Sequence, residues 1–140
     1  MQFKIWFENS TIDFKTGQPV TFQYVRNKEK SPYFGSRFQQ DIEPHGRYVI
    51  QKEVDDVPEG WETGEITFNN PLVVPFNVHP GGTYDDKSWK VELSRHFGGK
   101  TGRALSQAIV EAGYDGIITL GVGPDGKPDT KEIVDLRSFL

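Results

Sequence analysis

One glutamate, Glu132, comes directly before an apolar run near the C-terminal end of the sequence, in the stretch TKEIVDL. The apolar residues that follow it, Ile133 and Leu136 among them, are typical of a buried strand. A carboxylate held on a rigid strand can stabilise positive charge on a ligand or accept a proton. The alternative is a solvent-facing residue paired with a lysine, since glutamate is almost never buried without a partner.

Basic residues gather in one segment of the chain and acidic residues in the next. Residues 26–52 carry six lysines and arginines, among them Arg26 and Arg47, and residues 53–65 carry six acids and no base. Such a pattern indicates either two solvated surfaces or a basic lining for an anionic ligand.

Other common kinds of site lack the residues they need. The chain has no cysteine, which excludes disulfides and thiolate metal sites. His45, His79 and His96 do not fall at helical or strand spacing, so we expect no metal site. The stretch GVGPDG links two expected strands and opens no helix, so it lacks the context of a phosphate-binding loop.

Strands are expected over much of the first half of the chain. Alternating apolar and polar residues predict strands at 3–7, 20–27 and 47–54. The stretch WETGEITFNNPLVVPFNV, 61–78, predicts a strand, a break and a second strand, and the prolines place that second strand at an edge or a bend. Residues 28–46 are rich in glycine, proline and polar side chains and are expected to be mainly loop.

Two helices and a hairpin are expected in the second half. Apolar residues recur at helical spacing in 85–99 and again in 100–113, where Thr101 is placed to cap the start and Gly113 to end the helix. The stretches GIITL and KEIVDL then predict two paired strands. Strands followed by helices and a hairpin predict an α+β fold with a mostly antiparallel sheet.

Length and charge limit the number of domains and the kinds of partner that we expect. At 140 residues the chain fits one domain, residues 1–140. No apolar run approaches the ~20 residues that cross a bilayer, and the start, MQFKIWFENS, lacks the features of a signal peptide. A net charge of −4 gives no broad attraction to nucleic acid. We therefore expect a cytoplasmic protein with no membrane association.

The second half of the sequence resembles small ADP-ribosyltransferase-like domains of phage, prophage and polyvalent mobile-element proteins. The similar stretches are NPLVVPF, AIVEAGYDGIITL and KEIVDLRSF, in the family's order over roughly residues 65–140. The segment FGSRFQQDIEPHGRYVI is similar to the family's glycine-containing loop and the strand after it. The resemblance implies a split, mostly antiparallel β-sheet with two or three short helices that grips NAD in a cleft.

The activity that the resemblance implies is NAD-dependent ADP-ribosyl transfer to a host macromolecule, above all a protein. Its transition state resembles an oxocarbenium ion, which a nearby carboxylate stabilises. By resemblance, Glu132 is the catalytic acid, Arg26 is the cation that binds the ribose or diphosphate, and Tyr48 is the aromatic residue that stacks on nicotinamide. Arg47 and Gly46 fall at the rim of the same NAD site.

The sequence also departs from that family. Thr130 stands where arginine-modifying members carry an acid, no Ser-Thr-Ser motif is present, and WFENST stands nearest to the place of an opening His-Gly-Thr. A divergent enzyme and an inactive module that binds a protein partner or a nucleotide therefore both stay open, as does a virion structural or DNA-associated protein. For each residue an alternative stays open: Arg26 can be a surface base at the end of a strand, and Tyr48 can be a core tyrosine with its hydroxyl at the rim.

Overall fold

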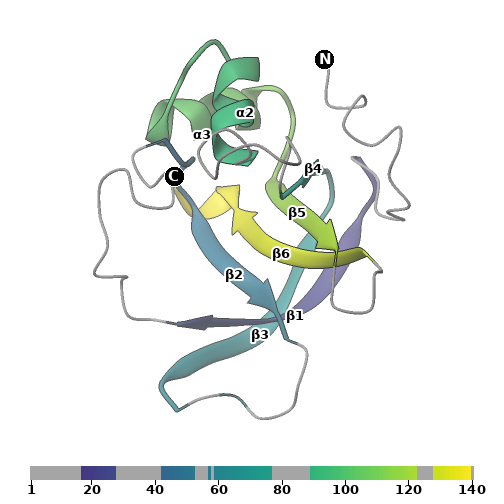
Figure 1. Cartoon of the computed structure of the whole chain (residues 1–140). Helices are drawn as coiled ribbons and strands as arrows, with labels where there is room; N and C mark the ends of the chain where they lie inside the picture. The colour runs from purple at the N-terminus through teal and green to yellow at the C-terminus, as the bar shows by residue number, and fades with distance from the viewer. Residues whose placement is uncertain are drawn as a thin grey trace.

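The computed structural model describes residues 17–27, 42–52, 57, 59–76, 89–122 and 128–139, and these residues form an α+β fold (Figure 1). The elements are β1 (Val20–Asn27), β2 (Arg47–Gln51), β3 (Trp61–Phe68), β4 (Pro71–Pro75), α2 (Trp89–His96), α3 (Gly102–Glu111), β5 (Gly116–Val122), β6 (Pro128–Asp135) and the 3₁₀ turn η3 (Leu136–Phe139). The strand expected at residues 3–7 lies outside the described residues.

Within the described residues, the strands form one mixed sheet in the order β3-β1-β2-β6-β5-β4. The pairs β1–β3, β1–β2, β2–β6 and β5–β6 are antiparallel, and β4–β5 is parallel. The predicted α+β class with a mostly antiparallel sheet is therefore confirmed. The prediction for the proline-flanked strand also holds, because β4 lies at one end of the strand order and its prolines, Pro71 and Pro75, are its first and last residues.

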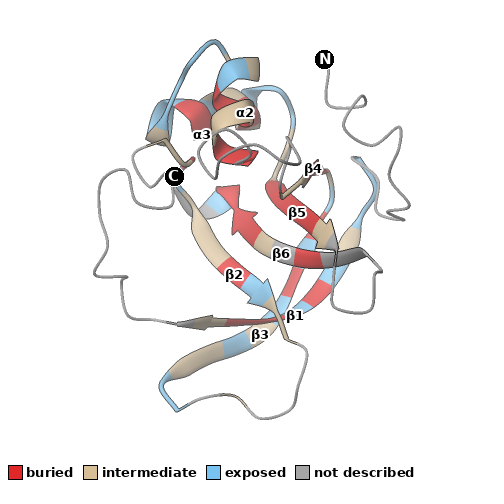
Figure 2. Ribbon diagram, in the orientation of Figure 1, coloured by how far each residue is buried: buried red, intermediate tan, exposed pale blue. Residues whose placement is uncertain are grey.

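One face of the sheet packs against the helices. Leu72, Ile117 and Val134 from three strands share a buried core with Leu93 of α2 and Ile109 of α3. Figure 2 shows buried segments in β5, in β6 and in both helices. The amphipathic pattern in 100–113 is confirmed in this core, where Leu105 and Ile109 are fully buried.

The opposite face of β4, β5 and β6 packs against β1 and β3, which belong to the same curved sheet. Val73, Ile118 and Ile133 alternate with the helix-facing residues of β4, β5 and β6, and they contact Phe22 of β1 and Phe68 of β3. The sheet therefore curves so that β1 and β3 cross beneath β6 while the helices lie above it (Figure 1). Strand β2 connects the two halves, because it pairs with β1 through its last residues and with β6 through its first.

Asp115 joins the turn between β3 and β4 to the start of β5. Its carboxylate accepts hydrogen bonds from the backbone N–H groups of Asn69 (2.7 Å) and Asn70 (3.1 Å). Its own backbone N–H donates to the carbonyl of Asn70, and its carbonyl accepts from the N–H of Leu136. The stretches NNPL, GYDGI and EIVDL, far apart in the sequence, therefore meet at this one residue.

The helices end as their glycines predict. Gly113 follows α3 with φ of 105°, and Gly98 and Gly99 follow α2 with φ of 73° and 79°, conformations that glycine adopts at little cost. Thr101 occupies the N-cap position of α3, although its side chain makes no capping hydrogen bond. No helix among the described residues is long and apolar enough to cross a membrane.

Candidate functional site

Glu132 projects from β6 toward the helices, and its carboxylate is held by an indole. Two residues along the strand, Val134 lies in the core beneath the helices, so Glu132 shares that face. The Nε1–H of Trp89, at the start of α2, donates to Oε2 of Glu132 over 3.1 Å. Trp89 is only 1% exposed, and a buried indole N–H requires an acceptor. Glu132 is thus half-buried and fixed in direction.

A local irregularity in the β5–β6 pairing holds the backbone at Glu132. The register runs from Ile118↔Ile133 to Leu120↔Thr130, so β6 has an extra residue opposite Thr119. The buried Thr119 hydroxyl accepts from the N–H of Glu132 and donates to its carbonyl oxygen, both over 2.7 Å. Bulges of this kind re-aim a side chain, and here the re-aimed side chain is a carboxylate.

Tyr48 lies on the neighbouring strand and faces the same side of the sheet. It pairs with Val134 and packs against the helix-facing core. Its hydroxyl donates to the carbonyl of Pro44 over 2.9 Å. Burial holds the pKa of Tyr48 well above its usual range, and the negative charges of Glu43 and Glu132 raise it further. Two carboxylates therefore lie near one phenol.

A buried lysine completes this group. The Nζ of Lys90 on α2 lies 3.4 Å from Oε1 of Glu43, with side-chain exposures of 5% and 20%. The same ammonium lies 5.8 Å from the ring centroids of Tyr48 and Trp89. We call Glu43, Tyr48, Trp89, Lys90 and Glu132 the carboxylate–aromatic cluster.

The pKa of Glu43 is raised above its usual value. Burial is the main cause and outweighs the opposing effects of the Lys90 charge and of hydrogen bonding with Tyr48 and Lys90; the charge of Glu132 adds a smaller increase. The cluster thus holds one glutamate whose pKa is raised by burial and a second that is oriented by an indole.

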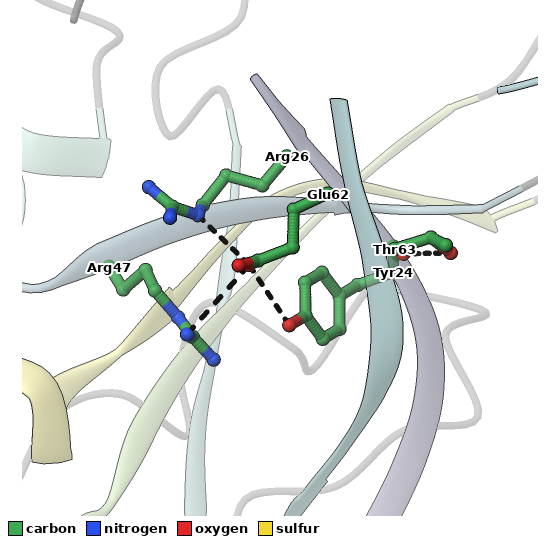
Figure 3. A network of polar contacts seen from close by, with 5 residues as sticks. All are labelled: Tyr24, Arg26, Arg47, Glu62 and Thr63. Atoms are coloured by element: carbon green, nitrogen blue, oxygen red, sulfur yellow. Dashed lines mark hydrogen bonds and ion pairs between the residues drawn. The ribbon is translucent and has the colours of Figure 1, made fainter. Parts of the chain in front are cut away.

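Arg26 and Arg47 meet in a different group, shown in Figure 3. Oε2 of Glu62 lies 3.2 Å from Nε of Arg26 and 3.8 Å from Nη1 of Arg47, and it accepts the hydroxyl of Tyr24 over 3.1 Å. The Arg47 guanidinium also lies 5.5 Å from the centroid of the Tyr24 ring. We call these four residues the arginine cluster.

The two clusters lie on opposite sides of β2. Arg47 projects on the same side as Val49, which belongs to the core between the sheet halves, whereas Tyr48 packs against the helix-facing core. The structure thus brings Tyr48 together with Glu132, and Arg26 together with Arg47, but does not bring the two pairs together.

Ion pairing sets the electrostatics of the arginine cluster. Hydrogen bonds from Arg26 and then from Tyr24 hold the pKa of Glu62 below its usual value. Burial raises the pKa of Tyr24, and its hydrogen bond to Glu62 adds to this. Within the described part of the chain, the buried Nε of Arg47 has no hydrogen-bond partner.

Gly46 has a packing role at the start of β2. A Cβ at this position would lie 2.7 Å from Cγ1 of Val134 and 2.9 Å from the carbonyl oxygen of Asp135. Only a residue without a side chain allows the chain to approach β6 this closely. The same approach brings Tyr48 into register beside β6.

Sequence reasoning did not identify Glu43, Trp89 or Lys90 as members of a site. Trp89 falls within the apolar helical pattern of 85–99 and is buried, but its bond to Glu132 follows from tertiary packing alone. Glu43 lies in a segment expected to be loop, where periodicity carries no signal. The one available clue was chemical, since a buried tryptophan needs an acceptor for its N–H.

Chemically, the carboxylate–aromatic cluster is suited to a ligand that is or becomes positively charged. Two carboxylates can stabilise developing positive charge, and one of them can accept a proton. Among the described residues, no group of three or more histidine, aspartate or glutamate side chains is placed to hold a metal ion. The chain matches no family model, no curated protein and no solved structure.

Proposed function

We propose that the protein is an NAD-dependent ADP-ribosyltransferase in which Glu132 is the catalytic carboxylate. The observation that carries the proposal is the position of Glu132, on a strand, oriented by Trp89 and next to Tyr48. The resemblance of the C-terminal half to phage and mobile-element ADP-ribosyltransferase-like domains supports it, as does the mixed, mostly antiparallel sheet. On that resemblance the acceptor is a host macromolecule.

The proposed mechanism uses Glu132 against the ribose. As the bond between nicotinamide and C1′ breaks, positive charge grows on the sugar, and a carboxylate fixed nearby stabilises it without first having to reorganise. The Trp89 N–H restricts the carboxylate to one orientation, and the Thr119 hydroxyl restricts the backbone behind it. Tyr48 is proposed to contact the nicotinamide ring.

The proposal does not place Arg26 and Arg47 at the bond that breaks. Their guanidinium groups lie on the other side of β2, with Glu62 as their shared carboxylate. This separation favours a second candidate function, an inactive module of the same fold that binds a nucleotide or a protein partner. The two candidates differ in whether NAD is cleaved.

Cleavage of NAD tests the proposal. The purified protein is incubated with NAD labelled in the nicotinamide ring, and free nicotinamide is measured against Glu132→Gln. Glutamine keeps an oxygen for the Trp89 N–H but carries no charge, so the rate should fall on the order of 10²–10³-fold with folding unchanged. Glu65→Gln is the matched control, because Glu65 lies exposed on β3.

Two outcomes of this experiment separate the candidates. Release by the wild type and by Glu65→Gln, but not by Glu132→Gln, supports the enzyme. If the wild type releases no nicotinamide, the enzyme proposal fails. NAD binding is then measured by thermal shift, since a ligand at a hundred times its Kd adds about 2.7 kcal/mol to the free energy of unfolding of a protein that binds it.

A further inference from the structure

A second carboxylate, that of Glu43, lies beside Tyr48 and reaches the cluster from a different element than Glu132. It belongs to the segment before β2, which is anchored on α3. The backbone N–H of His45 donates to the carbonyl of Gly102 over 3.4 Å, and the Ser106 hydroxyl donates to the carbonyl of His45 over 2.6 Å. Glu43 is therefore placed by the backbone as well as by its ion pair with Lys90.

The surroundings of the two glutamates differ. Glu132 accepts a hydrogen bond from a neutral indole. Glu43 faces the Lys90 ammonium from α2, the Tyr48 phenol from β2 and the Glu132 carboxylate from β6. Different surroundings for two neighbouring carboxylates are the usual basis for different catalytic roles.

The balance of forces on Glu43 suits proton transfer. Burial disfavours its charged form, while Lys90 keeps that form accessible, and the net result is a raised pKa. A base is most effective when its pKa lies near the working pH, because it is then largely ionised and yet strong enough to take a proton. The raised pKa of Glu43 moves it in that direction.

We infer that Glu43 is the base that takes the proton of the acceptor group while Glu132 faces the sugar; this rests on the proposed ADP-ribosyl transfer. The C1′–N bond of NAD breaks, and its electron pair stays with nicotinamide, which leaves as a neutral molecule. A lone pair on the acceptor oxygen or nitrogen forms the new bond to C1′. The acceptor's proton moves to the Glu43 carboxylate, which later releases it to solvent.

Hydrolysis of NAD, with water as the acceptor, provides the test. The pH dependence of kcat is measured for the wild type, Glu43→Gln and Glu132→Gln. In the wild type the rate should rise with pH as Glu43 ionises, and this rise should lie above the ordinary glutamate value of 4.5. Glu43→Gln should lower kcat on the order of 10²–10⁴-fold and abolish that rise, with a much smaller effect on KM for NAD.

A second variant distinguishes a loss of catalysis from a loss of folding. Glu43→Gln removes a carboxylate from beside a nearly buried ammonium, and breaking such a pair is often costly. The double variant Glu43→Gln/Lys90→Met replaces both charges and should fold, since neutral replacement of a buried ion pair is often tolerated. It should show the same flat pH profile as the single variant.

Failure of this inference can be told apart from failure of the proposed function. If the wild type hydrolyses NAD, Glu132→Gln does not, and both Glu43 variants keep the wild-type rate and pH profile, then Glu43 is not the base and the proposed function stands. If the wild type releases no nicotinamide, the proposed function fails, and the role of Glu43 in it falls too.

Discussion

The indole nitrogen of Trp89 lies 3.1 Å from Oε2 of Glu132, which fixes the direction of this helix-facing carboxylate on β6. Trp89 begins α2, and its neighbour Lys90 holds Glu43. The first two residues of one helix therefore position both glutamates of the carboxylate–aromatic cluster. Any displacement of this helix end would move both acids.

Replacing Trp89 by phenylalanine should destabilise the fold by about 1.5–3 kcal/mol, because the change removes a hydrogen bond to a charged group and keeps most of the ring. Urea unfolding of Trp89→Phe against the wild type measures this. Trp61→Phe, at the half-buried start of β3, is the control and should cost less. Equal costs for the two variants would mean that the indole N–H contributes nothing.

Replacing Thr119 by valine should destabilise the fold by about 2 kcal/mol, since an isosteric methyl group leaves the N–H and carbonyl of Glu132 without their hydroxyl partner. Thr119→Ser keeps the hydroxyl and should recover most of the loss. Under the proposed function, Thr119→Val should also release nicotinamide more slowly than Thr119→Ser. Valine and serine variants of equal stability would contradict this account of the bulge.

Local patterns predicted the elements of the fold well and the site only in part. The strands at 20–27 and 61–68 and both helices follow from periodicity, and the ends of the helices follow from Gly98 and Gly113. Glu132 and Tyr48 meet because β2 pairs with β6, a long-range register that sequence periodicity does not specify.

The separation of Arg26 from Glu132 shows what sequence reasoning could not supply. Arg26 sits near the end of a predicted strand, and Tyr48 near the start of another, but the face on which each projects depends on how the whole sheet curves. That curvature arises when Phe22 and Phe68 pack against Ile118 and Ile133. Glu62, which attracts both arginines, comes from a third strand.

Adding a methyl group at Gly116 should destabilise the fold by roughly 1–3 kcal/mol or more, because a Cβ there would overlap the ring of the fully buried Phe68. The double variant Gly116→Ala/Phe68→Leu tests the cause. If the overlap is responsible, the double variant should lose less stability than the sum of the two single variants. Simple additivity in urea unfolding would locate the cost elsewhere.

Acid should weaken the arginine cluster. The pKa of Glu62 in the folded chain lies below its ordinary value of 4.5, so its contribution to stability is fully present above that pH and is lost as the pH falls through the folded pKa. Glu62→Gln should therefore be less sensitive than the wild type to acidification below about pH 4.5. Thermal unfolding across this range measures the difference.

The control for that measurement is Glu65→Gln, three residues along the same strand, where the exposed carboxylate accepts from Gln23. It should keep the wild-type response to acid. A Glu62→Gln protein that loses stability as steeply as the wild type would show that other carboxyl groups govern acid unfolding.

Arg47 and Tyr48 project on opposite faces of β2, so the register of β2 against β6 cannot shift by one residue without exchanging them. Such a shift would place the Arg47 guanidinium beneath the helices and turn the Tyr48 phenol toward the core between the sheet halves. The tight contact of Gly46 with Val134 blocks such a shift at its starting point. Insertions or deletions within β2, Arg47–Gln51, should therefore be absent from any functional descendant of this sequence. The identities of the outward-facing side chains of β2 can drift.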